Sequence, residues 1–122
     1  EGDIIIFGAP NAVRGASHIG SLGAGDMGEA GLCDVLASDY FYPAMLAAVA
    51  QLGREKRAER LALWSLVSSG PARAMRLDDR GDIIVGKRAD LVMVDWPKGQ
   101  TPAILGTWVA GRSSYRGMMS VA

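Results

Sequence analysis

The sequence has little cysteine and no excess of charge of either sign. Cys33 is its single cysteine, which excludes an internal disulfide framework and fits a reducing compartment, so we expect a cytoplasmic protein. Thirteen Lys and Arg residues balance thirteen Asp and Glu residues. Because no net charge is left to attract a polyanion, we expect neither nucleic acid nor a membrane surface among the partners. No apolar run approaches the ~20 residues that cross a bilayer.

The sequence also lacks the residue sets that complete a metal or nucleophile site. His18 is the single histidine, and neither a Cys-x-x-Cys pair nor a Ser-His-Asp order is present. A closed metal site usually needs three or four protein ligands. The chain has 122 residues, 49% of them hydrophobic, and a strongly apolar run begins close to Glu1. We therefore expect one small domain or, more specifically, a piece of a larger fold.

The pattern of apolar runs and turns predicts an α/β chain with a β-rich tail. Two continuous apolar runs, Ile4–Phe7 and Leu32–Ala37, are typical of parallel strands that are buried on both faces. One helix is expected from Pro43 to Gly53 and a second over 55–68, which Gly70-Pro71 should end. One or two further helical turns are expected over Ala72–Leu77. Strands are then predicted at four short segments: Asp82–Val85, Ala89–Asp95, Ile104–Ala110 and Ser113–Arg116.

The segment between the two apolar runs, 11–31, is rich in glycine and is expected to be a loop. Its residues Gly23 to Gly28 have the G-x-G-x-x-G spacing of dinucleotide-binding loops. Such a site needs a strand that leads directly into the first glycine and a helix that opens at the last one. The preceding strand ends near Gly8, and the next strand follows too soon for a crossover helix. We interpret these glycines as a surface connection.

Polar side chains follow each of the two predicted strands. Asn11, Arg14 and His18 come after the first strand, and Asp39 comes after the second. The carboxyl edge of parallel strands is where α/β folds place catalytic groups. We expect Asp39 to be partly desolvated, which favours pairing or metal binding, although it is equally suited to cap the following helix. Asn11 and Arg14 either recognise a phosphate through planar donors or hydrogen-bond within their loop, and His18 is either structural or functional.

Two groups of motifs resemble the amidohydrolase superfamily. Residues 70–92 are similar to the "NPA…G…G.I..G..ADLV" passage, by which such chains leave a metal-bearing (β/α)₈ barrel for a small β-sandwich, although Gly70 stands where the family usually has Asn. Upstream, "GAPNAVRGASHIG" and "GLCDVLASDYFYPAML" resemble the phosphonate-utilisation branch. Its members are the ribose methylphosphonate triphosphate diphosphatases of the carbon–phosphorus lyase pathway. Gly20-Ser21 replaces the Gly-Asn that is usual in that branch.

The resemblance implies an architecture and a set of site residues. Residues 1–77 would be the last two strands and helices of the barrel, and 78–122 a β-rich segment of a composite sandwich domain. Asp39 matches the aspartate that follows the eighth barrel strand, which ligates metal and takes a proton from the hydrolytic water. Asn11, Arg14 and His18 match the motif after strand seven, and their chemistry suits phosphate or ribose recognition.

The resemblance also implies an activity for the parent protein. That protein would use a divalent metal, Zn or Mn, to hydrolyse a small phosphorylated substrate, a ribose methylphosphonate triphosphate, and would release pyrophosphate. The 122 residues alone should be inactive, hold no metal and associate as homo-oligomers, because a partial barrel exposes strand edges. The alternatives are an amidohydrolase that acts on C–N bonds, as a cyclic amidase or a deaminase, and a non-catalytic oligomeric fragment.

Overall fold

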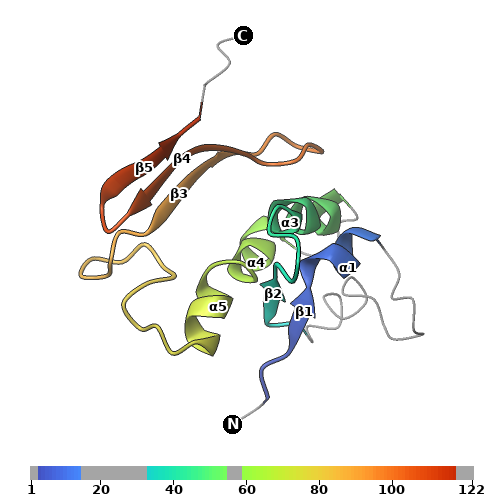
Figure 1. Ribbon diagram of the computed structural model, residues 1–122, viewed down its shortest axis with the longest axis horizontal. Coiled ribbons are helices and arrows are strands. Elements are labelled where there is room, and N and C mark those ends of the chain that lie inside the picture. Colours follow the sequence, from blue (N-terminus) through green and yellow to red (C-terminus); the bar gives the residue numbers. More distant parts are fainter. Residues whose placement is uncertain (1–2, 15–32, 55–58, 118–122) are drawn as a thin grey trace.

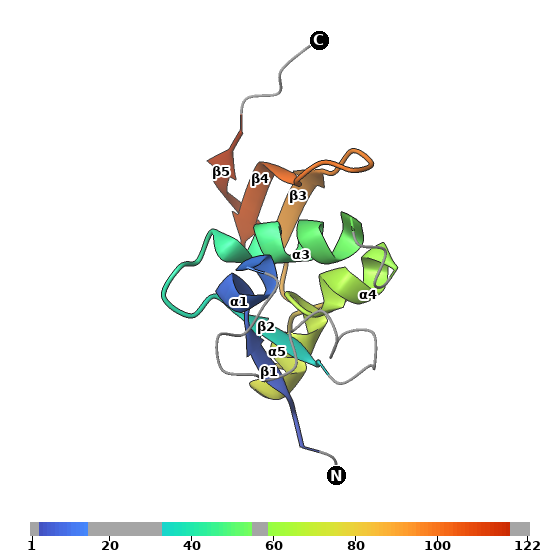
Figure 2. The same ribbon diagram turned by 90° about the vertical axis from the view of Figure 1, so that its right-hand side faces the viewer.

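The computed structural model describes residues 3–14, 33–54 and 59–117. It contains a two-stranded and a three-stranded sheet, and in both views helix α3 lies between them (Figure 1 and Figure 2). Within the described ranges, no helix has the length and apolar character needed to cross a membrane. The elements follow in the order β1 (Ile6–Gly8), α1 (Ala9–Arg14), β2 (Val35–Ala37), α3 (Ala44–Arg54), α4 (Arg60–Ser65), α5 (Ser69–Ala74), β3 (Leu91–Asp95), β4 (Ala103–Val109) and β5 (Arg112–Arg116).

The first two predicted strands form a parallel pair, as the apolar runs indicate. Ile6 pairs with Val35 and Gly8 with Ala37, so both strands end at the same edge. Their burial differs from the prediction, however. Val35 is buried, whereas Ile6 of β1 is 56% exposed. The expectation of burial on both faces is wrong for β1, because a parallel pair needs covering elements on both sides and the described residues supply them on one side.

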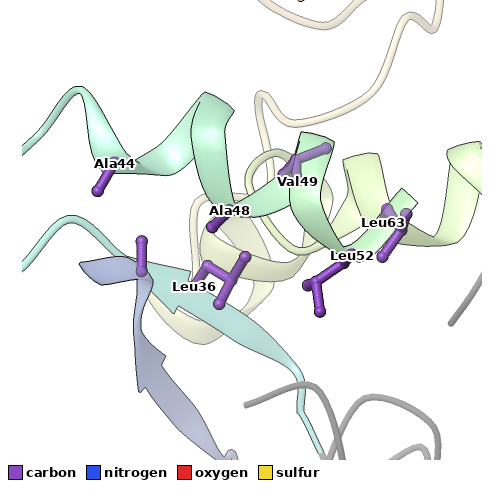
Figure 3. Packing of buried hydrophobic residues seen from close by; sticks show 7 residues of the cluster. Leu36, Ala44, Ala48, Val49, Leu52 and Leu63 are labelled. Atoms are coloured by element: carbon purple, nitrogen blue, oxygen red, sulfur yellow. The ribbon is translucent and has the colours of Figure 1, made fainter. Parts of the chain in front are cut away.

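Helix α3 organises the hydrophobic core. It begins directly after Pro43 and ends one residue beyond Gly53, which confirms the predicted helix. Its buried face packs on β2 and on α4, as Figure 3 shows for Leu36 and Leu63. The buried cluster consists of Ala9, Leu36, Ala44, Ala48, Val49, Leu52 and Leu63. Small residues at one-turn spacing, Ala44 and Ala48, let α3 approach α1 closely.

The second predicted helix is shorter than expected, and Gly70-Pro71 does not end it. Helix α4 covers Arg60–Ser65, a turn follows, and α5 begins at Ser69. Pro71 is therefore in the first turn of α5. Backbone N–H groups of a first turn have no hydrogen-bond acceptor within the helix, so the missing N–H of proline costs no hydrogen bond there. The predicted residues 55–58 lie outside the described part of the chain. The prediction failed because the boundary was placed at the proline, which is tolerated in a first helical turn.

The tail forms an antiparallel meander that confirms three of the four predicted strands. Leu91 pairs with Trp108, Asp95 with Ala103, and Val109 with Arg112. The β4–β5 turn uses positive φ at Ala110 and Gly111, +50° and +77°, which matches the twist of a tight hairpin. The fourth prediction, a strand at Asp82–Val85, is wrong, because this segment has no strand beside it among the described residues and a strand requires a ladder partner.

The three-stranded sheet leaves apolar side chains open on both of its faces. Neighbouring side chains of a strand point to opposite faces, and Leu91, Val92 and Met93 are 37%, 41% and 49% exposed. Ile83 and Val85, in the segment before the sheet, are almost fully exposed. An apolar cavity of about 370 Å³ lies between this segment and the sheet. Neither face of this sheet is therefore fully covered by other residues of the described chain.

Candidate functional site

The carboxyl ends of β1 and β2 bring together the segments that carry the sequence-predicted residues. Gly8 and Ala37 are the last paired residues of the two strands. Asn11 and Arg14 belong to α1, which begins directly after β1, and Asp39 follows β2 by two residues. The described part of 11–31 is thus a helical turn rather than the expected loop. His18 and the glycine motif at 23–28 lie outside the described residues.

Asp39 has an unusual backbone conformation. Its φ is +54°, in the left-handed region that non-glycine residues seldom adopt, although Asp tolerates it better than most. The turn that holds it is closed by the Phe41 amide, which donates to the Ser38 carbonyl oxygen at 3.0 Å. Non-glycine residues in this region often lie at functional sites, where the surrounding structure imposes the strain. The conformation therefore marks Asp39 as a candidate functional residue.

The Asp39 side chain is exposed, contrary to the expected partial desolvation. The three aromatic residues that follow it, Tyr40, Phe41 and Tyr42, are 67%, 53% and 82% exposed, so they do not cover the carboxylate. The alternative role as a helix cap is not observed either. The first amides of α3 donate to the Phe41 and Tyr42 carbonyl oxygens, and the described residues show no hydrogen bond to the Asp39 carboxylate. With respect to the described residues, the carboxylate is therefore available to accept a ligand.

The described residues do not by themselves complete a metal site. Across residues 3–14, 33–54 and 59–117, no group of three or more His, Cys, Asp or Glu residues could hold an ion. Asp39 offers a carboxylate, which is a normal ligand for a divalent metal. It can supply one ligand, and the described residues do not supply the others.

Cys33 does not contribute a reactive group to this edge. It precedes β2, at the opposite end of the strand from Asp39, and is half-buried. Burial raises the pKa of its thiol, while a hydrogen bond to the Val35 carbonyl oxygen has a smaller, opposite effect. Because the thiolate is the nucleophilic form, a raised pKa makes this thiol unreactive at neutral pH.

A second group of charged residues, which the sequence did not single out, anchors the sheet to the preceding segment. Asp90 accepts hydrogen bonds from the Ala110 amide at 2.8 Å and from Arg88 Nε at 2.9 Å, and it pairs with Arg80 at 3.3 Å. Arg80 also forms two bonds with Asp79. Asp90 is the aspartate of the motif Ala89-Asp90-Leu91-Val92. Because these contacts join the β4–β5 turn to the segment before β3, its role here is structural. Only its place in the motif signalled it, because two of its three partners, Arg80 and Ala110, are 10 and 20 residues away.

The Asp90 network makes a pH-dependent contribution to stability. The Ala110 amide and the two guanidinium groups lower the pKa of Asp90 in the folded state. A lowered folded-state pKa means that the stabilisation is present above the unfolded pKa of about 3.9 and is lost as pH falls through the folded value. We expect Asp90→Asn to lower Tm at pH 7 and to have a much smaller effect near pH 2, as measured by circular dichroism.

Asp78→Asn is the matched control for this prediction. Asp78 is exposed, and its carboxylate makes no hydrogen bond within the described chain. Its substitution should leave Tm nearly unchanged at both pH values. Equal effects of the two substitutions, or an Asp90→Asn effect that persists undiminished at pH 2, would contradict the assignment.

Comparison with known proteins identifies the family. Residues 21–115 match the family described as "Amidohydrolase family". The match covers most of the chain, including β2, helices α3 to α5 and the meander. The chain belongs to the amidohydrolase family, which confirms the resemblance seen in the motifs. Members of this superfamily generally use divalent metals.

One known protein shows a more specific similarity than the family match does. The chain is 46% identical over 92 residues to the alpha-D-ribose 1-methylphosphonate 5-triphosphate diphosphatase of Escherichia coli (strain K12). The match covers 73% of this chain and 24% of that protein, so the chain spans about a quarter of the relative's length. No solved structure matches the chain significantly. The predicted similarity to the phosphonate branch is thereby confirmed.

Proposed function

We propose that this chain is the carboxyl-terminal portion of a metal-dependent hydrolase that acts on α-D-ribose 1-methylphosphonate 5-triphosphate and releases pyrophosphate. The observation that carries the proposal is the 46% identity over 92 residues to a diphosphatase named for this compound. An identity at this level over most of the chain supports a shared reaction more strongly than membership of a family, because families of one fold host several reactions.

Asp39 is the proposed metal ligand and proton acceptor. Its exposed carboxylate at the carboxyl end of β2 supports both roles, since it is not engaged by another described side chain. A divalent metal, when bound, lowers the pKa of its coordinated water to about 7. The Asp39 carboxylate would then accept the proton of the attacking water. The left-handed backbone of Asp39 fixes the direction from which this carboxylate approaches.

Asn11, Arg14 and His18 are the proposed substrate-binding residues. Asn11 and Arg14 follow β1 at the same sheet edge that Asp39 follows after β2, and this parallel register supports a shared site. A guanidinium matches two phosphate oxygens at once, and amide and imidazole groups donate single hydrogen bonds to phosphate or ribose oxygens. Arg14 would neutralise phosphate charge, and Asn11 and His18 would orient the substrate.

The two sheets correspond to the two proposed parts of the parent protein. Residues 1–77 would complete the carboxyl-terminal part of a (β/α)₈ barrel, and 78–122 would join a composite sandwich. The exposed side of β1 and the open faces of the meander support this division, since both are surfaces that further polypeptide would cover. The same surfaces support self-association of the isolated chain, and a cytoplasmic location stays a prediction.

Two other functions are compatible with particular observations. The family is named for amide hydrolysis, so an enzyme that cleaves C–N bonds, a cyclic amidase or a deaminase, is the second candidate. The open apolar faces would suit a non-catalytic oligomeric fragment. A phosphate-bearing substrate distinguishes the first proposal from the second, because only the former requires Arg14.

A chimera tests the proposed function. We would replace the matching segment of the Escherichia coli diphosphatase with this chain and supply zinc or manganese. We expect the chimera to hydrolyse the triphosphate and release pyrophosphate, and the 122-residue chain alone to be inactive. Arg14→Gln in the chimera should raise KM by at least about tenfold, since a charge-assisted hydrogen bond is lost.

Arg112→Gln serves as the control for Arg14→Gln. Arg112 begins β5 and is exposed, so its substitution should leave KM unchanged. A folded chimera that cleaves a cyclic amide and leaves the triphosphate intact would contradict the proposal. Triphosphate hydrolysis by the isolated chain would contradict the proposed dependence on further polypeptide.

A further inference from the structure

A cleft with several charged lining residues lies at the opposite end of α3 from Asp39. It is a cleft of about 830 Å³ between the last turn of α3, the start of α4 and the loop that follows β3. Its charged lining residues are Arg54, Glu59, Arg60 and Lys98. We refer to it as the basic cleft. Figure 2 shows the loop after β3 above the end of α3 that lies next to α4.

One wall of the basic cleft, formed by Arg60 and Trp96, is fixed by contacts within the protein. The Arg60 guanidinium lies over the Trp96 ring, 5.0 Å from its centroid, and Nη1 donates to the Trp96 carbonyl oxygen at 3.0 Å. The Trp96 indole N–H in turn donates to the Gln100 carbonyl oxygen at 3.0 Å. Trp64 packs against the Trp96 ring with a centroid distance of 6.2 Å. A guanidinium restrained in this way loses little freedom when an anion binds.

The positive charges of the basic cleft are not neutralised within the described chain. Arg54 donates to the neutral Gln51 side chain at 2.8 Å, and Arg60 to a carbonyl oxygen. The ion pairs of the described residues instead involve Arg80, Lys87 and Arg88. Among the described lining residues, three cations face one carboxylate, Glu59, which leaves an excess of two positive charges. A concave surface with unpaired charge of one sign concentrates counter-ions.

Small residues leave room for a ligand in the basic cleft. A Cβ at Gly53 would be 3.4 Å from Trp96 Cζ2, so glycine lets the ring lie against the end of α3. At Gly99 a Cβ would have no atom within 4 Å, so the loop leaves open space there. The cleft volume lies in the range of about 300 to 1,000 Å³ that is usual for small-molecule sites.

We propose that the basic cleft binds a small oligophosphate, a di- or triphosphate group, at a site separate from the edge that carries Asp39. Two guanidinium forks suit pairs of phosphate oxygens, and the charge excess suits a ligand with two or more negative charges. Helix α3 separates the two sites, since its 11 residues at a rise of about 1.5 Å span roughly 15 Å. The argument depends on the cleft alone and not on the proposed hydrolase activity.

Calorimetric titration of the 122-residue chain with inorganic pyrophosphate tests this proposal. We expect one bound pyrophosphate per chain and weaker binding of sulfate, which carries less charge. Arg60→Gln and Lys98→Gln should each raise the dissociation constant about tenfold, because each removes a charge-assisted contact. Lys98 is exposed and makes no hydrogen bond within the described chain, so its variant tests binding without disturbing the Trp96 wall.

The control variants distinguish the basic cleft from other places that could bind an anion. Arg112→Gln, on β5, should leave the dissociation constant unchanged. The absence of measurable pyrophosphate binding would overturn the proposal, as would equal affinity for sulfate. Loss of binding in Arg14→Gln with normal binding in Lys98→Gln would also overturn it, because the anion would then occupy the edge near Asp39. Failure here leaves the chimera experiment unaffected, since that experiment measures catalysis at the other edge.

Discussion

Asp39→Asn in the chimera should lower kcat for the triphosphate by about 10² to 10⁴, the usual contribution of a general base. The proposed roles require a carboxylate at this position, and an amide can neither accept the proton nor bind a divalent metal comparably. Asn is a suitable replacement because, like Asp, it tolerates the left-handed φ of +54° that the turn imposes. The loss should therefore come from chemistry and not from a changed backbone. Steady-state kinetics with pyrophosphate detection measures it.

The control for Asp39→Asn is Asp95→Asn, which changes another exposed aspartate at the end of β3. This variant should keep kcat within about twofold, because surface substitutions away from a site have small effects. The metal content of both variants should be measured as well, and we expect it to fall for Asp39→Asn. An Asp39→Asn chimera with unchanged kcat and metal content would remove Asp39 from the proposed site.

Leu36→Ala should destabilise the chain by about 2 to 5 kcal/mol, the usual cost of truncating a core leucine. Leu36 is 1% exposed and lies where β2 meets α3 and its buried cluster (Figure 3). The substitution removes apolar contacts and leaves a cavity that short strands cannot easily close. Because domains are stable by only about 5 to 15 kcal/mol, the loss is a large fraction of the total. Urea unfolding followed by circular dichroism measures the change.

Leu61→Ala is the matched control, since it removes the same atoms from an 86% exposed leucine on α4. It should change the free energy of unfolding by at most about 0.5 kcal/mol. Similar losses for the two variants would show that β2 and α3 do not form the core of the chain in solution.

Local patterns predicted the elements that have a pairing or packing partner within the described chain. The apolar runs of β1 and β2, and the turn-spaced small and apolar residues of α3, correspond directly to observed elements. The same reasoning failed at Asp82–Val85, which has the composition of a strand but no neighbour to bond with. Composition measures the tendency to form a strand, whereas a strand exists only when a second segment pairs with it.

The structure explains why glycine occupies position 70, which the sequence showed only to be an unusual choice. Gly70 departs from the Asn that is usual in the family. A Cβ at this position would clash with the Asp34 carbonyl oxygen and would lie only 2.8 Å from that of Ser65. The start of α5 therefore approaches the chain before β2 too closely for a side chain. The sequence could show that the residue was unusual, but not which backbone atoms required it.

The candidate site was predicted in part. The order of strands and polar residues indicated that Asn11, Arg14 and Asp39 follow strand ends, and the parallel register places these chain segments at one edge. The exposure of Asp39 could not be inferred, because burial depends on atoms contributed by distant segments. The Asp90 network was missed for the same reason, since Arg80 and Ala110 reach it only through the folded chain.

The sequence by itself determined the family, the parallel pair of strands, the core helix and the identity of the carboxylate at the strand end. These follow from local spacing and from motifs, which are properties of contiguous residues. Only the tertiary structure decided which surfaces are covered, how Asp90 anchors the sheet, and that Arg54, Arg60 and Lys98 meet in one cleft. Burial, ion pairing and clefts arise from contacts between segments far apart in the chain, and no local pattern encodes them.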